Sequence, residues 1–355
     1  MATFSAGKSP SVLLHEDEIT DFFSRVESIA SRPSYPSPED PLLTLLDSDS
    51  TGRMRSIIES IPFAGDVRAS GDVVHRRIAN ALDETLLIGA PYGFCMAVIF
   101  FTMRELCGME KGKNPTWVKV NGKRTAFGAS FLASTLKRNC QNMLLDLRDE
   151  YRGLAEPFSS SFSICSDVRE LPLRDESVSR IITSPPYLTR IDYAVSTTPE
   201  LSIFGNDDLV RFVRHNSMGS TVITSSPKAQ QERWGLLCNQ LLDAIKAHST
   251  KAAASYYWKN IIQYFMDLDL ALDQIKRVLG SDGRGLVVVQ SSYFKEVEIP
   301  LGEIYVEMAR LNGLDAEIAF REEVKGHMAH VNTKSSAYKK NKIYHEDFVQ
   351  IQKRI

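Results

Sequence analysis

The string Thr183-Ser-Pro-Pro-Tyr187 begins at the last residue of a short β-prone run, 181–183. It combines a hydroxyl, two prolines and an aromatic ring. Each proline fixes φ and removes a backbone donor, so we expect a rigid lip whose carbonyls point outward as unused acceptors. An exocyclic amino group fits such a lip. The Ser184 hydroxyl and a backbone carbonyl of Pro185 or Pro186 would accept its two N–H bonds, while Tyr187 stacks on the ring. This geometry makes a poor amine nucleophilic without a strong base.

Three side chains just past the lip are candidates for contact with the same substrate. Arg190, Asp192 and Tyr193 either reach the substrate that carries the amine and a phosphate beside it, or belong to an ordinary loop ion pair, and the sequence favours neither.

The chain as a whole has nearly equal numbers of acidic and basic residues, but they are unevenly distributed along the sequence. The net charge of the 355 residues is −2, which excludes bulk attraction to nucleic acid. Residues 1–50 hold three basic and nine acidic side chains, whereas residues 320–355 hold eight basic and four acidic ones. The second segment includes a basic loop that either contacts DNA phosphates or forms a solvated face, made of Lys334, Lys339, Lys340 and Lys342.

The lip resembles the catalytic motif of the amino-group DNA methyltransferases, which methylate N4 of cytosine or N6 of adenine with S-adenosylmethionine. The likeness covers about residues 160–355, including the acidic segment around Asp167 and the segments 255–260 and 287–293. It implies that Asp167 accepts from the adenine amino group of the cofactor and that Ser184 lies against the cofactor as well as the amine. The serine form of the motif favours cytosine N4.

The sequence departs from this family where the cofactor should bind. We find no glycine-rich loop after a first strand; the nearest candidate, Pro62-Phe-Ala-Gly-Asp66, lacks the small residues that should continue it. The resemblance therefore implies a split enzyme, in which a second polypeptide supplies the cofactor-binding half. A catalytically silent DNA-binding or scaffolding subunit of a restriction or defence complex is the alternative, and an RNA amino-methyltransferase is a third.

The elements that must position these residues change character along the chain. Residues 1–52 are expected to be an acidic, Pro/Ser-rich arm and linker. Residues 53–155 are expected to be helical and suited to partner docking, because apolar residues recur at steps of three or four from Leu132 to Leu147. Residues 156–355 are expected to form the catalytic domain, with a helical insertion at about 195–255.

Within that domain, strands are expected at 162–165, 181–183, 285–290, 315–321 and 346–352, with long helices at 234–245 and 257–279 and a shorter one at 301–311. The resulting fold class is α/β: part of a doubly wound, Rossmann-like sheet of the class I methyltransferase type, preceded by a mostly helical region.

Other residue classes carry no chemistry in this interpretation. The five cysteines are scattered and never form Cys-x-x-Cys, and His327-Met-Ala-His330 lacks further ligands at a helpful spacing, so we expect no metal. The longest apolar run, 94–101, is far shorter than the roughly 18 residues that cross a bilayer. With no signal-peptide pattern at the start, we interpret the chain as cytoplasmic.

Overall fold

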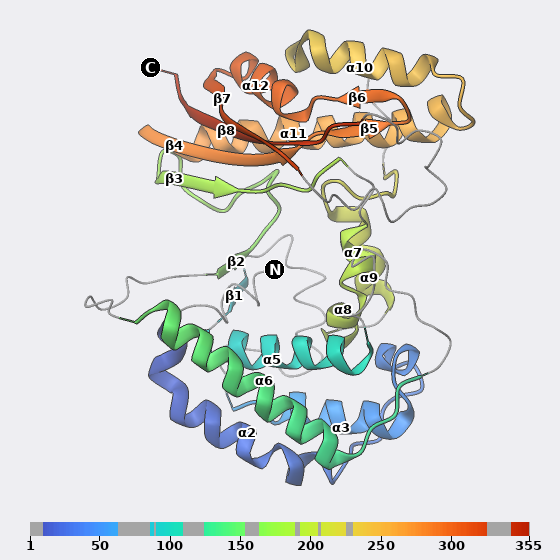
Figure 1. Ribbon diagram of the computed structural model, residues 1–355, viewed down its shortest axis with the longest axis vertical. Coiled ribbons are helices and arrows are strands. Elements are labelled where there is room, and N and C mark those ends of the chain that lie inside the picture. The colour runs from blue at the N-terminus through green and yellow to red at the C-terminus, as the bar shows by residue number, and fades with distance from the viewer. Residues whose placement is uncertain are drawn as a thin grey trace. The chain divides into compact units, whose positions relative to one another are not determined.

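The computed structural model describes residues 10–62, 86–88, 90–108, 124–152, 163–188, 192–204, 207–224, 230–324 and 342–354. The chain divides into two compact units, each with its own apolar core (Figure 1). Unit 1 contains residues 1–166 and 197–212, and unit 2 contains residues 167–196 and 213–355.

Unit 1 is a helical bundle with a small sheet. Its elements are η1 (Pro10–His15), α2 (Glu16–Ala30), η2 (Pro41–Thr44), α3 (Ser48–Glu59), β1 (Leu86–Ile88), α5 (Ala90–Leu106), α6 (Ala129–Glu150), β2 (Ser163–Cys165) and α8 (Thr198–Phe204). Strand β1 pairs with β2 in antiparallel fashion.

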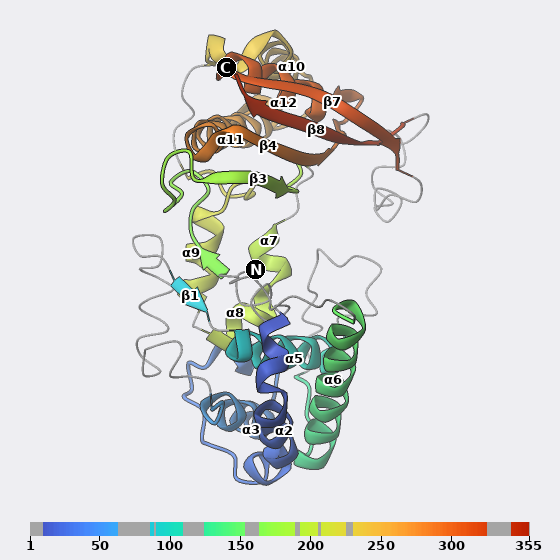
Figure 2. The ribbon, with the colours of Figure 1, turned by 90° about the vertical axis from the view of Figure 1, so that its left-hand side faces the viewer.

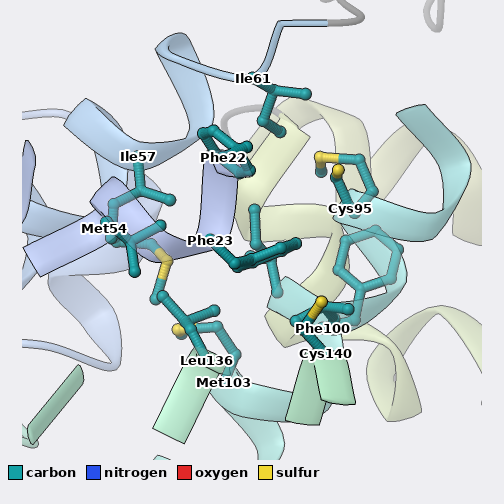
Figure 3. Close-up of a cluster of buried hydrophobic side chains, with 14 of the residues drawn as sticks. Phe22, Phe23, Met54, Ile57, Ile61, Cys95, Phe100, Met103, Leu136 and Cys140 are labelled. Carbon is teal, nitrogen blue, oxygen red and sulfur yellow. The ribbon is translucent and has the colours of Figure 1, made fainter. Parts of the chain in front are cut away.

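The core of unit 1 is built from apolar stripes on four helices. Figure 3 shows side chains of α2, α3, α5 and α6 meeting around Phe22 and Phe23. Helix α5 is apolar on all sides, and its residues 91–100 are all buried, as expected for a helix enclosed by others. The stripe predicted from Leu132 to Leu147 lies on α6, with Met143 at its half-buried edge.

The segment expected to be an arm and linker contributes to this core from Val12 onward. Phe22, Leu42 and Leu46 are almost completely buried. Prolines interrupt the segment without excluding it from packing, since Asp40 caps η2 and forms a salt bridge with Arg55 at 2.7 Å. The guanidinium of Arg55 also donates to the carbonyls of Ser202 and Ile203 in α8.

Unit 2 is a mixed α/β layer structure. Its helices and helical turns are α7 (Tyr193–Ser196), η5 (Glu232–Trp234), α10 (Gly235–Ala247), the π-helical turn η6 (Ala253–Tyr257), α11 (Trp258–Val278) and α12 (Leu301–Leu311). Its strands are β3 (Val178–Thr183), β4 (Leu279–Gln290), β5 (Ser292–Phe294), β6 (Val297–Ile299), β7 (Leu314–Glu323) and β8 (His345–Lys353). Helix α9 (Asp207–Asn216) spans residues of both units.

The main sheet of unit 2 has the strand order β3-β4-β8-β7. Strands β3 and β4 are parallel, with Thr183 opposite Val287, and β8 runs antiparallel to both of its neighbours. Helices α10, α11 and α12 lie on one side of this sheet (Figures 1 and 2), where Val287, Val289 and Val349 are buried against them. The fold is thus mixed α/β with a mixed sheet, whose four strands correspond to those expected at 181–183, 285–290, 315–321 and 346–352. The strand expected at 162–165 was wrongly assigned to this domain, because β2 pairs with β1 in unit 1, and the hairpin of β5 and β6 was not expected.

Two boundaries differ from expectation. Strand β4 begins directly after α11, so Gly280–Gly283 belongs to the strand rather than to a separate turn. Strand β3 begins at Val178, three residues earlier than expected, because it pairs with β4 along its length. Helix α12 ends before Gly313, whose φ of +83° is the left-handed conformation common after a helix C-terminus.

Candidate functional site

The Pro-Pro lip lies at the carboxyl end of β3, which is the end of parallel strands where ligands bind in open α/β sheets. Ser184 follows the strand and its side chain is exposed. Its hydroxyl donates to the Tyr187 hydroxyl over 3.3 Å, which leaves the lone pairs of Ser184 Oγ available to another donor. The lip therefore presents an acceptor to solvent at the place where the sequence predicted one.

The two proline carbonyls differ from each other. The Pro186 carbonyl accepts a hydrogen bond of 2.9 Å from the hydroxyl of Tyr264, a buried residue of α11. The expectation that both carbonyls are unused acceptors is therefore wrong for Pro186, because a buried tyrosine hydroxyl takes the nearest available acceptor. In the described part of the chain no hydrogen-bond donor contacts the Pro185 carbonyl, so Ser184 and Pro185 form the open part of the lip.

Two further contacts brace the lip. The Tyr187 backbone N–H donates to the Tyr193 hydroxyl over 3.2 Å, and the Leu188 carbonyl accepts from Ser292 Oγ over 2.9 Å. Gly219, at φ +74°, packs so closely that a Cβ there would lie 3.0 Å from Pro186 Cβ. The lip is thus held by elements far apart in the sequence, namely α11, α7, β5 and the turn after α9.

Tyr187 connects the lip to strand β8. Its hydroxyl lies 3.2 Å from Glu346 Oε1 and donates to it, while accepting from Ser184. Burial raises the pKa of the Tyr187 phenol, the carboxylate of Glu346 raises it further and the bond from Ser184 opposes the rise. The phenol is therefore protonated at neutral pH and acts as a hydrogen-bond donor. Stacking of its ring on a base stays a prediction.

Glu346 is the site residue that the sequence did not reveal. Its place is fixed by the β4–β8 ladder, in which Gln290 lies opposite Glu346, and by two bonds between Ser291 and the backbone of His345. It lies 159 positions from Tyr187, so no local spacing could connect them. The only available signal was the alternation of β8, which places Glu346 on the opposite face from buried Asp347.

Asp167 is engaged by the protein itself. Its Oδ1 accepts from the backbone N–H and Nε of Arg169, and its Oδ2 accepts from Nε and Nη2, at 2.6–3.0 Å. Three N–H groups of Arg169 make these contacts, because the single Nε–H is shared between the two oxygens, so they occupy about three of the four lone-pair sites of the carboxylate. Asp167 is therefore held mainly by Arg169, and the expected bond from the adenine of a cofactor stays a prediction.

Arg169 also binds a second carboxylate, Asp267 of α11, over 2.9 Å. Burial alone would raise the pKa of Asp167, but the hydrogen bonds from Arg169 outweigh it and lower that pKa. Asp267 is more deeply buried and receives a single bond from Arg169, so burial raises its pKa. Of the two carboxylates, Asp267 is the first to take up a proton as the pH falls.

The residues just past the lip are only partly described. Arg190 lies outside the described residues. Asp192 forms a structural ion pair: it accepts from Arg214 Nε and Thr221 Oγ1 at 2.8 Å each, and from the N–H of Val195 in α7. This is the loop ion pair that the sequence left open. Tyr193 braces the lip, as described above, and DNA contact by either residue stays a prediction.

Of the four lysines in the expected basic loop, the structure describes only Lys342. Lys334, Lys339 and Lys340 lie outside the described residues, as do His327 and His330. The ammonium of Lys342 donates to the Lys295 carbonyl and lies 4.6 Å from the centre of the Tyr293 ring. Burial lowers the pKa of Lys342. This lysine therefore has partners within unit 2, and its expected contact with phosphate is untested.

The cysteines with described side chains are poor nucleophiles. Burial raises the pKa of Cys107 to about 11 and that of Cys140 to about 12, and it also raises the pKa of Cys95 and Cys238. Thiols, not thiolates, are present at neutral pH. Among the residues that the structure describes, no three His, Cys, Asp or Glu side chains gather as a metal site, and no helix is long and apolar enough to span a membrane.

Comparisons with protein-family models, with curated proteins and with solved structures gave no match to this chain. Function is therefore argued from the lip and its surroundings.

Proposed function

We propose that this chain is a subunit of a DNA amino-methyltransferase that modifies an exocyclic amine, with cytosine N4 favoured over adenine N6. The observation that carries the proposal is the open acceptor pair at the end of β3: the exposed Ser184 hydroxyl next to the Pro185 carbonyl. Two acceptors on adjacent residues match the two N–H bonds of an amino group. The hydrogen bond from the buried Tyr264 hydroxyl to the Pro186 carbonyl holds the neighbouring backbone, and hence these two acceptors, in place.

In this proposal the chain binds and orients the amine. Ser184 Oγ and the Pro185 carbonyl accept its two N–H bonds, which turns the nitrogen lone pair away from the lip and towards the methyl donor. S-adenosylmethionine, when bound, supplies the methyl group on a positively charged sulfur. Positioning the two reactants in line provides most of the rate gain, and no covalent bond to the enzyme is needed. The target base must leave the duplex to reach the lip.

Two observations support a second polypeptide that carries most of the cofactor contacts. Asp167, the residue that the resemblance assigns to the cofactor, already accepts hydrogen bonds from three N–H groups of Arg169. Among the described strands, β3 has a single neighbour, β4, and its Ile182 side chain is 82% exposed. Parallel strands are normally paired and covered on both faces. An edge of this kind suits continuation of the sheet by a partner.

The engagement of Asp167 by Arg169 also favours the alternative, a methyltransferase-like subunit that binds DNA or organises a restriction or defence complex without transferring a methyl group. The two proposals differ in what the lip does. A silent subunit needs neither the Ser184 hydroxyl nor a partner with a glycine-rich loop.

Methyl transfer from labelled S-adenosylmethionine tests the proposal. The chain is assayed alone, and together with the product of its neighbouring gene, on DNA and on RNA of the same sequence. Transfer to DNA by the mixture, abolished by Ser184→Ala, is the expected result. No transfer in any sample despite DNA binding would favour the silent subunit, and transfer confined to RNA would reassign the substrate.

A further inference from the structure

Three side chains of unit 2 form a continuous hydrogen-bonded chain that begins at the open acceptor of the lip. Ser184 Oγ donates to the Tyr187 hydroxyl over 3.3 Å, and that hydroxyl donates to Glu346 Oε1 over 3.2 Å. Every hydrogen bond in the chain points from the lip towards the carboxylate. The chain is therefore polarised so that a proton entering at Ser184 can leave at Glu346.

We propose that Glu346 is the terminal proton acceptor of the methylation reaction and acts on the amine through Tyr187 and Ser184. This inference rests on the proposed function. It assigns to β8 a positioning and proton-accepting residue that does not itself touch the substrate.

The electron and proton balance is simple. The nitrogen lone pair forms the new bond to the methyl carbon of a sulfonium donor, and the carbon–sulfur bond breaks with its electron pair going to sulfur. The nitrogen then carries a positive charge and one proton too many. That proton passes to Ser184 Oγ as the Ser184 proton passes to Tyr187 and the Tyr187 proton passes to Glu346. The amine is left neutral and methylated, and Glu346 is left protonated.

The surroundings of Glu346 suit this role. Its side chain is half-buried, and its Oε1 lies 3.2 Å from the Tyr187 hydroxyl. The pKa of Tyr187 is raised, so the phenol keeps its proton at rest and can shuttle one without becoming an anion that competes for the amine. The Ser291–His345 bonds fix the start of β8 and hence the reach of Glu346 to the lip.

Glu346→Gln separates proton acceptance from hydrogen bonding. The glutamine carbonyl can still accept from Tyr187, so a purely structural role predicts little change, but an amide cannot take the proton. We expect the single-turnover rate of methyl transfer to fall by about tenfold or more, with unchanged DNA affinity, and Glu346→Asp to recover part of the rate. Tyr187→Phe should lose a similar factor, and the double variant should lose no more than either single one.

Glu322→Gln is the matched control, because it removes the neighbouring exposed carboxylate of β7, which is not a partner of Tyr187. A second readout needs no activity: the ionisation of the Tyr187 phenol, followed by carbon NMR of labelled tyrosine and assigned with Tyr187→Phe. Removal of the Glu346 charge should lower the pKa of Tyr187, and Glu322→Gln should lower it less.

The outcomes distinguish the two claims. Wild-type transfer with a normal rate for Glu346→Gln overturns the relay and leaves the proposed function intact. An unchanged Tyr187 ionisation in Glu346→Gln also overturns the relay, since the contact would then be absent in solution. If the wild-type complex transfers no methyl group to any amine, the proposed function fails, and the relay fails with it.

Discussion

At the scale of single residues, the lip is determined as much by its brace as by its own sequence. Prolines limit the backbone of Ser184–Tyr187, but Tyr264 selects which carbonyl stays open by occupying the one on Pro186. Tyr264 is almost fully buried, so its hydroxyl must find a partner inside the protein.

Tyr264→Phe should therefore loosen the lip without creating a cavity. Loss of this hydrogen bond is expected to lower the free energy of unfolding by about 1–2 kcal/mol, because the half-buried Pro186 carbonyl loses its donor. Urea unfolding measures the change, and methyl transfer should fall with it. Tyr256→Phe is the control. The Tyr256 hydroxyl also donates to a backbone carbonyl, that of Thr221, but the Tyr256 side chain is exposed to solvent. Equal losses in the two variants would contradict a special role for Tyr264.

The Asp167–Arg169 pair makes stability depend on acid pH. The pKa of Asp167 in the folded protein lies below the ordinary value of 3.8, so its ion pair stabilises the fold above that pH. The stabilisation is lost as the pH falls through the lowered pKa.

Asp167→Asn should cost about 2 kcal/mol at neutral pH, because the amide offers Arg169 one acceptor oxygen instead of two and no negative charge. The difference in unfolding free energy between wild type and variant should shrink as the pH falls below 3.8. Urea unfolding at stepwise lower pH measures it, with Glu170→Gln, an exposed neighbour, as the control. If the difference in unfolding free energy grew on acidification, the negative charge of Asp167 would not be what stabilises the fold.

At the scale of elements, the turn after α9 supports the lip through backbone shape. Gly219 combines φ +74° with close contact to Pro186. Gly219→Ala is expected to destabilise unit 2 by about 1–2 kcal/mol, because an L-residue is strained in the left-handed region. It should also slow methyl transfer by displacing Pro186.

The control for this turn is Gly128→Ala, where a Cβ would meet nothing within 4 Å. Thermal unfolding followed by circular dichroism compares the two variants. A neutral Gly219→Ala variant would mean that the turn adapts and does not brace the lip.

The sequence predicted the elements better than their contacts. Helix α11 and strands β4, β7 and β8 were predictable because apolar periodicity is a local signal. The same periodicity could not show that Arg169 forms an ion pair with Asp167. A basic residue two positions away is normally interpreted as a solvent-exposed charge unless its burial is known. Glu346 is recognised only through strand pairing, which depends on contacts between distant segments.

Segment composition was misleading at the N-terminus. Prolines and serines at 31–50 suggested a linker, but the apolar residues between them, such as Leu42 and Leu46, pack into the core of unit 1. Proline limits the type of secondary structure and does not decide burial. Composition alone therefore does not separate an irregular core segment from a solvated one.

At the scale of the whole molecule, the net charge is close to zero, but basic residues are concentrated in the C-terminal segment 320–355. The net charge of −2 gives no general attraction to DNA, so binding should depend on the basic C-terminal segment. Lys339→Ala combined with Lys340→Ala should weaken DNA binding equally across sequences and reduce the salt slope of the affinity by about 1–2. Fluorescence anisotropy over a salt series measures this. An unchanged slope would place the phosphate contacts elsewhere in the chain.

The measurement that tests the central claim most directly is mass spectrometry of nucleosides from DNA treated with this chain, the product of its neighbouring gene as the proposed partner, and S-adenosylmethionine. The lip predicts a methyl group on an exocyclic nitrogen, with N4-methylcytosine favoured, and its complete loss in Ser184→Ala. Unmodified DNA, a methyl group on a ring carbon, or a modification that survives Ser184→Ala would contradict an amine-binding lip at the end of β3.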